Sequence, residues 1–165
     1  MLLAPLAVGV AAPARGQEAE LSCQSKFSVE QVIEDLNAFR AQPRSCGPQG
    51  FGPAGPLRWD GRLAQVAQRH AAELAQGDLL NHLSSNGRTL RERLRGNGYL
   101  AYRLGENLAA GQESLDEVLQ TWIVSAKHCE NIMQADFRDV ALACAGGPGK
   151  HGRYWVLNLG RSVRD

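Results

Sequence analysis

The sequence lacks a marked excess of either charge, because 18 Lys and Arg residues face 17 Asp and Glu residues for a net charge of +1. Proteins that bind nucleic acid or an acidic membrane electrostatically carry a strong basic surface, and this composition does not indicate one. Long apolar runs are also missing outside residues 2–12. We therefore expect no nucleic-acid partner and no transmembrane anchor in the mature chain.

The sequence also lacks the short motifs of several common chemistries. It has no Cys-x-x-Cys pair for zinc, no His-x-x-x-His of a zincin helix and no Gly-x-Ser-x-Gly elbow. The Pro- and Gly-rich segment 43–56 is not a phosphate cradle, because the closing Lys-Ser/Thr of a P-loop is absent. We interpret that segment as an irregular loop.

Residues 2–12 form an apolar run about as long as the core of a secretory signal. Small residues follow at two sites suitable for signal peptidase, Ala12-Pro13-Ala14 and Ala14-Arg15-Gly16, although no basic residue precedes the run. We expect a signal peptide at 1–16, truncated at its start, an extension at 17–27 and one domain at 28–165. The protein is then secreted or periplasmic; a disordered tail is the alternative interpretation of the first segment.

The chain has four cysteines, Cys23, Cys46, Cys129 and Cys144. Export favours disulfides, and an even count leaves no odd thiol for catalysis. Four cysteines allow three pairings, of which we expect the two local ones, Cys23–Cys46 and Cys129–Cys144.

Helical spacing and capping residues predict helices over 28–41, 60–76, 87–94 and 114–125. Residues 140–145 and 154–159 are rich in β-branched and aromatic side chains, and a Gly-Gly-Pro-Gly turn separates them, which predicts an antiparallel hairpin. This order favours an α+β fold. The arginines at 88, 91, 93, 95 and 103 are locally dense, but acidic residues interrupt them, which favours a solvated helix face.

Two histidines and one carboxylate are the candidate site residues, namely His82, Glu106 and His128. Such groups can bind a divalent cation or transfer a proton, but their spacing alone carries no metal signal. A further histidine, His70, lies on the apolar face of the helix over 60–76, where a hydrogen-bonded core residue is expected more often than a ligand.

The segments around these residues resemble the CAP superfamily, the SCP-domain family of cysteine-rich secretory, antigen 5 and pathogenesis-related proteins. The matching segments occur in the family's order and are Asn81-His82-Leu83-Ser84, Gly105-Glu106-Asn107, and Trp122 with His128-Cys129-Glu130-Asn131. The resemblance covers about residues 28–161 and is closer to the single-domain bacterial branch. It implies an α-β-α sandwich with a small antiparallel sheet between helices.

The resemblance also implies a central cleft with two histidines and two acidic residues. His82, Glu106 and His128 match three of them, whereas Ser125 stands where the second glutamate is usual. We therefore expect a weak site for a divalent cation such as zinc, and no required cofactor. Asn107, Ser125 and Asn131 could support the cleft, although the two amides could equally satisfy loop backbone groups.

The resulting expectation is an extracytoplasmic binding or interaction module for an unknown extracellular ligand, either lipid or protein. Two alternatives stay open. One is a hydrolase or peptidase in which His82, Glu106 and His128 form the active cleft, with Ser125 and His128 as the catalytic pair and Glu106 as the orienting group. The other is a cleft whose polar groups only hold loops together.

Overall fold

The computed structural model describes Cys23 and residues 27–164. The predicted signal peptide at 1–16 lies outside the described residues, as does the extension at 17–27 apart from Cys23 and residue 27. The helices are Val29–Arg40 (α2), Gly61–Gly77 (α3), Leu90–Gly96 (α4), Leu115–Val124 (α5) and Ala126–Met133 (α6). None of the helices in the described part of the chain is long and apolar enough to cross a membrane.

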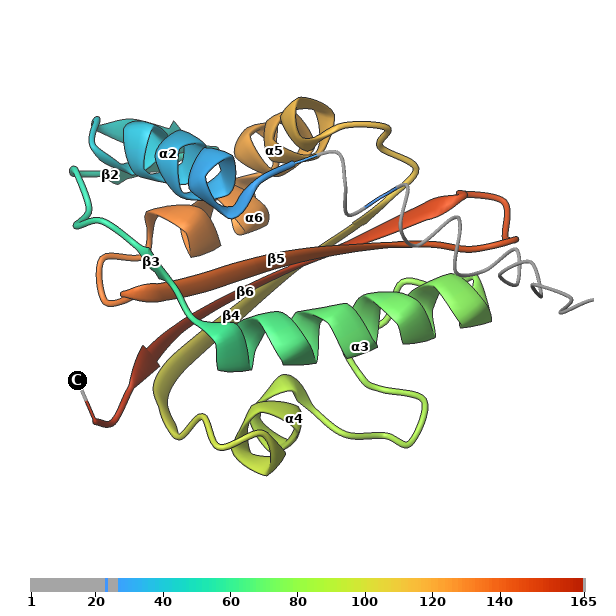
Figure 1. Ribbon diagram of the computed structural model, residues 1–165. Coiled ribbons are helices and arrows are strands. Elements are labelled where there is room, and N and C mark those ends of the chain that lie inside the picture. The colour runs from blue at the N-terminus through green and yellow to red at the C-terminus, as the bar shows by residue number, and fades with distance from the viewer. Residues whose placement is uncertain (1–22, 24–26, 165) are drawn as a thin grey trace, which may run out of the picture.

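A central sheet separates two helix layers (Figure 1). Its four strands run in the order β3-β5-β6-β4, and they are Arg58–Trp59 (β3), Ala101–Ala110 (β4), Asp139–Gly146 (β5) and Arg153–Ser162 (β6). Helices α2, α5 and α6 cover one face, and α3 and α4 cover the other (Figure 1). The expected α+β sandwich is thus confirmed.

The predicted hairpin is present as β5 and β6, which pair antiparallel. Strand β4 adds to β6, also antiparallel, while the two-residue strand β3 pairs with β5 in parallel. The sequence does not predict β4, because its Gly, Glu and Asn residues are uncommon in strands. Pairing with the whole length of β6 overrides that preference.

The two faces of the sheet carry separate parts of the core. Along β6, Trp155, Leu157 and Leu159 pack in the layer of α2 and α5, whereas Tyr154 and Val156 pack against α3. This alternation follows from the two-residue repeat of a strand. It sends successive residues of the neighbouring strand β4 toward opposite helix layers as well.

Capping side chains set the start of most helices. Ser28 accepts from the backbone N–H of Gln31, Asp60 opens α3, and Ser114 opens α5, as the sequence predicts. Helix α4 begins at Leu90 rather than at residue 87, because Thr89 and Glu92 form a capping box there. Helix α6 is not predicted from the sequence; the extended backbone of Ser125 separates it from α5.

The expectation of an irregular loop over 43–56 is wrong for its first half. Strands Arg44–Cys46 (β1) and Gln49–Phe51 (β2) form a small antiparallel hairpin. Gly47 turns it with a φ of 60°, and a side chain there would stand 2.9 Å from the Cβ of Ala126. The hairpin is therefore shaped by its contact with α6, which local sequence does not indicate.

Arg40 connects α2 to the chain that follows α6. It is buried, and its guanidinium donates to backbone carbonyls of Gly55, Ile132, Gln134 and Phe137. Burial, with a smaller contribution from another arginine, lowers its pKa from the ordinary value to about 10. A planar fork with five donors suits this position, because several carbonyls converge on one side chain.

The predicted disulfide pairing is wrong. The structure joins Cys23 to Cys144 and Cys46 to Cys129, with Cα–Cα distances of 5.7 and 5.4 Å. Short sequence separations favour the local pairs in an unfolded chain. In the folded chain β1 packs on α6, so that Cys46 meets Cys129 in one cluster with Met133. Packing of the layers, and not loop length, decides which sulfurs meet.

We predict that non-reducing peptide mapping finds Cys23–Cys144 and Cys46–Cys129. Replacing both Cys46 and Cys129 with alanine should lower the free energy of unfolding by roughly 2–5 kcal/mol, because this bond closes a long loop. The bond spans a sequence separation of 83 residues. Urea unfolding measures the loss, and a Cys23–Cys46 peptide from the native protein would contradict the pairing.

Candidate functional site

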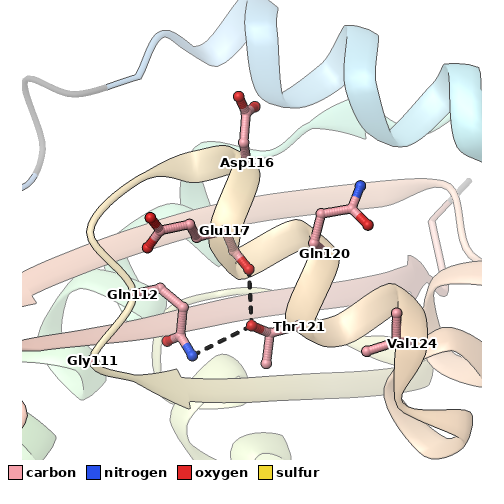
Figure 2. Close-up of a pocket in the computed structure, with 7 residues that line it drawn as sticks. All are labelled: Gly111, Gln112, Asp116, Glu117, Gln120, Thr121 and Val124. Carbon is pink, nitrogen blue, oxygen red and sulfur yellow. Dashed lines mark hydrogen bonds between the residues drawn. The ribbon is translucent and has the colours of Figure 1, made fainter.

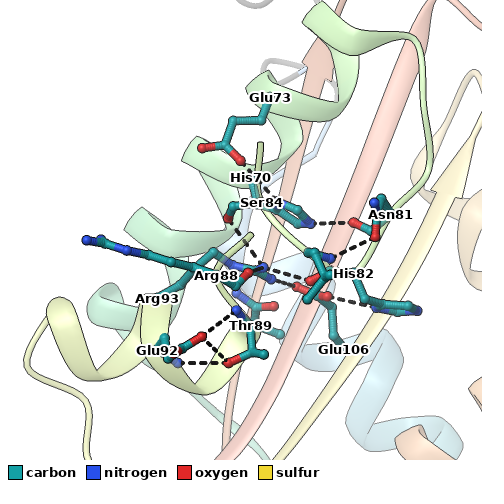
Figure 3. Close-up of polar contacts among 12 residues, drawn as sticks. His70, Glu73, Asn81, His82, Ser84, Arg88, Thr89, Glu92, Arg93 and Glu106 are labelled. Carbon is teal, nitrogen blue, oxygen red and sulfur yellow. Dashed lines mark hydrogen bonds and ion pairs between the residues drawn. The ribbon is translucent and has the colours of Figure 1, made fainter. Parts of the chain in front are cut away.

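The polar segment between α3 and α4 meets the edge strand β4. The segment between α3 and α4 carries His82, and β4 carries Glu106 and Asn107. Because strand residues alternate, Glu106 faces the layer of α3 and α4, while Asn107 faces α6. Figure 3 shows the polar contacts that gather around Glu106.

The Glu106 carboxylate is buried, with 4% of its side chain exposed. Nδ1 of His82 donates to its Oε1 at 2.8 Å, and Nη2 of Arg93 donates to its Oε2. In the amide orientation that satisfies both of its ends, Asn158 also donates to Oε2 at 3.3 Å and accepts from the backbone N–H of Ala67. Burial of a carboxylate is costly unless the charge is paired, and here both oxygens have partners.

Arg93 is the site residue that the sequence interpretation missed. The expected solvated helix face is wrong at this position, because only 8% of the Arg93 side chain is exposed. Its Nη1 also donates to the backbone carbonyls of His82 at 2.8 Å and Arg88 at 3.2 Å. Helical spacing could have found it, since Arg93 lies one turn from Leu90 and beside the buried Leu94.

His70 supports the segment that carries His82. It is buried on α3, and its Nε2 donates to the backbone carbonyl of Asn81 at 2.9 Å. Burial lowers the pKa of His70, with a further lowering by the charge of Arg93. The prediction of a hydrogen-bonded core histidine is confirmed, and this side chain fixes the residue that precedes His82.

The His82 ring is held on one side and open on the other. Its hydrogen bond to Glu106 raises its pKa, although partial burial and the Arg93 charge oppose that rise. The side chain remains 65% exposed. Because Nδ1 is engaged by Glu106, Nε2 is the ring nitrogen available to a ligand, and a raised pKa favours a donating N–H at that position.

His128 lies on α6, on the other side of β4. Burial lowers its pKa, and the charge of His82 lowers it further. Within the described residues, neither Glu106 nor Ser125 makes a hydrogen bond to the His128 ring, whose Nδ1 is buried without a partner. The described contacts thus join His82 directly to Glu106, and none of them joins the His128 ring to either residue.

Comparison with known proteins decides the family. The sequence model of CAP, the cysteine-rich secretory protein family, matches residues 33–159. This chain belongs to the CAP family.

Three relatives place this CAP chain among known proteins. It is 25% identical to the YkwD protein of Bacillus subtilis (strain 168) over 135 residues, which is 79% of this chain and 49% of that protein. An extracellular SCP-domain protein from Bacillus anthracis has the same fold at a TM-score of 0.70 and 21% identity, over 92% of this chain and 45% of that one. An outer surface protein from Borrelia burgdorferi gives a TM-score of 0.68 and 20% identity, over 81% and 91% of the two chains. The chain spans about half the length of YkwD and of the Bacillus anthracis protein.

Two amides near Glu106, those of Asn107 and Asn131, contact backbone groups and each other. Asn107 donates to the carbonyl of His128 at 3.0 Å, and Asn131 donates to Oδ1 of Asn107 at 2.8 Å. These contacts hold α6 against β4 and do not involve an imidazole ring. Ser125 makes no side-chain capping bond to α6, and none of the described contacts joins it to His128.

The three expected metal ligands do not fit a preformed site in this CAP structure. Among the described residues, no group of three or more His, Cys, Asp or Glu side chains is arranged to hold a metal ion. Both Glu106 oxygens are engaged, one of them by the guanidinium of Arg93. A metal bound to Oε2 of Glu106 would compete with a cation that the fold already supplies.

The described structure also has a pocket away from the Glu106 network. Its volume is about 610 Å³, and residues of α5 and of the segment after β4 line it (Figure 2). Thr121 accepts a hydrogen bond from Gln112 at its edge, 3.4 Å long. None of its lining residues belongs to the Glu106 network, so size alone does not mark the functional site.

We predict that replacing Glu106 with glutamine lowers the pKa of His82, because the carboxylate contact is the main cause of its rise. In the native protein, histidine NMR titration should give His82 a pKa above the ordinary value of about 6.5 and His128 one below it. The His82 contact therefore contributes stability that is present below about pH 6.5 and is lost as the pH rises through the raised pKa.

Glu130→Gln is the matched control, because Glu130 pairs only with the exposed Lys127 among the described residues. It should leave the His82 titration unchanged. Glu106→Gln should also lower the free energy of unfolding by about 3–5 kcal/mol, since it leaves Arg93 buried without a counter-charge. An unchanged His82 pKa in Glu106→Gln would contradict the assigned contact.

Proposed function

We propose that this chain is an extracytoplasmic binding module that recognises an extracellular ligand, lipid or protein, through His82. The observation that carries the proposal is one exposed imidazole held by a buried carboxylate. A fixed ring loses little conformational freedom when a ligand binds, which favours affinity. The raised pKa favours the protonated ring, whose Nε2 offers an N–H to acceptor groups of the ligand.

Export is part of the proposal and rests on separate observations. Two disulfides fit an oxidising compartment, whether outside the cell or in the periplasm. Two proteins of the same fold are described as extracellular and as an outer surface protein. The apolar segment 2–12 has the composition of a secretory signal.

The hydrolase interpretation lacks a supporting contact. Acyl transfer by Ser125 requires a hydrogen bond to a base, and the base requires an orienting group. The described contacts join Glu106 to His82 and not to His128. We therefore predict that Ser125→Ala and the native protein hydrolyse simple esters and a casein substrate at the same rate.

We predict that His82→Ala abolishes co-sedimentation of the purified protein with vesicles or envelope material prepared from its own source. His151→Ala is the matched control, because His151 is exposed and lies outside the Glu106 network. Binding should weaken as the pH rises through the raised pKa of His82, because the donating N–H at Nε2 is lost. Equal binding by His82→Ala and the native protein would refute this use of the cleft.

We predict that zinc binds this chain through the imidazoles of His82 and His128. The CAP-fold protein NaASP2 was crystallised with Zn²⁺, at a TM-score of 0.51 and 13% identity. In this chain Arg93 already donates to the Glu106 carboxylate. We therefore predict a micromolar or weaker affinity for zinc, which corresponds to a binding free energy of about 8 kcal/mol or less.

Calorimetric titration at about pH 7.5 and about pH 5.5 tests this, because protonated imidazole does not ligate and binding should fade at the lower pH. His82→Ala and His128→Ala should each remove the binding. Ser125→Glu should strengthen it by adding a carboxylate. Unchanged affinity in both alanine variants would place the ion elsewhere.

A further inference from the structure

A polar cavity of about 400 Å³ lies beside the Glu106 network, between α3, α4 and the segment that joins them. Arg93 and Ser84 belong both to this cavity and to the contacts that hold the His82 segment. Its charged lining consists of three arginines and one carboxylate, namely Arg69, Arg88, Arg93 and Glu73 (Figure 3 shows the last three).

Two of the three guanidinium groups, those of Arg69 and Arg88, have no carboxylate partner among the described residues. Arg69 donates to a neutral amide, Oδ1 of Asn97, at 2.9 Å. No hydrogen bond or ion pair of the Arg88 guanidinium is found in the described part of the chain, although its charge acts on nearby Glu92. Glu73 accepts from the backbone N–H of Ser85 at 3.3 Å. Cations that share a recess with few carboxylates raise the local concentration of anions.

Arg93 supplies an independent observation. It is more than nine-tenths buried, and its Nε–H has no acceptor among the described residues. Buried donors in folded proteins nearly always have a partner, which can be a bound ion or water. Arg93 also lines the cavity, so an anion bound there would place negative charge next to this guanidinium.

We infer that the ligand of the cleft carries an anionic group, carboxylate or phosphate, which occupies this cavity. Arginine is suited to both, because its planar fork donates in pairs to either anion. The inference rests on the proposed binding function and adds the class of group recognised. The anionic group would lie near His82, because Arg93 lines the cavity and donates to the backbone carbonyl of His82.

Titration of the full chain with inorganic phosphate and, separately, with succinate tests the inference. Backbone NMR shifts of the segment 84–88 report binding, and the stronger ligand shows whether tetrahedral or planar anions are preferred. Arg69→Gln and Arg88→Gln should each weaken binding about tenfold, the effect expected when a hydrogen bond to a charged group is lost. Glu73→Gln should strengthen binding, because it removes the carboxylate that repels the anion.

Arg95→Gln is the matched control. Arg95 is an exposed arginine on α4, the helix that carries Arg93, and it lines a different pocket. If Arg95→Gln weakens anion binding as much as Arg69→Gln does, the effect is one of general surface charge and the inference is overturned. The inference is also overturned if neither phosphate nor succinate saturates the protein. His82→Ala should retain phosphate binding. If His82→Ala loses envelope binding while the native protein binds neither anion, the inference about the cavity is refuted and the proposed function stands.

Discussion

The buried carboxylate of Glu106 is the constraint around which this molecule is arranged. Only 4% of the Glu106 side chain is exposed, and its charge needs partners because the protein interior solvates it poorly. Arg93 provides the counter-charge, and it must come from α4. Helix α4 and the segment before it are therefore tied to β4 by electrostatics as well as by apolar packing. The same carboxylate fixes His82, so the side chain proposed to bind the ligand depends on the pair that stabilises the fold.

Adjacent residues of β4 connect the edge strand to both helix layers. Glu106 binds side chains on the α3 and α4 side, and Asn107 binds the backbone of α6 on the other. Trp122 of α5 extends the second set by donating to the carbonyl of Leu108 at 3.1 Å. An edge strand offers this opportunity, since side chains can extend past its free side. The polar residues that make β4 a weak strand former are thus the ones that organise the site.

The proposed role of this arrangement is recognition and not bond cleavage. The open His82 ring and the neighbouring arginines offer donors and positive charge, whereas the described contacts give Ser125 no base. Arg93 also occupies the carboxylate that a metal would need. A site with a built-in cation is suited to ligands that bring negative charge or acceptor groups, and the cavity beside it has room for one.

The sequence by itself determined the periodic and local features. Apolar spacing and the capping residues Ser28, Asp60 and Ser114 specify three helices, and β-branched content specifies the hairpin, because these signals act between residues close in the chain. The order of the His82, Glu106 and His128 segments identifies the family. Only the tertiary structure decided the features that join distant segments. The pairing of Cys46 with Cys129, the burial of Arg93 and the strand at Glu106 depend on which layers pack together. Local propensity does not predict which layers pack together, because the energy that decides their packing comes from contacts formed only in the folded chain.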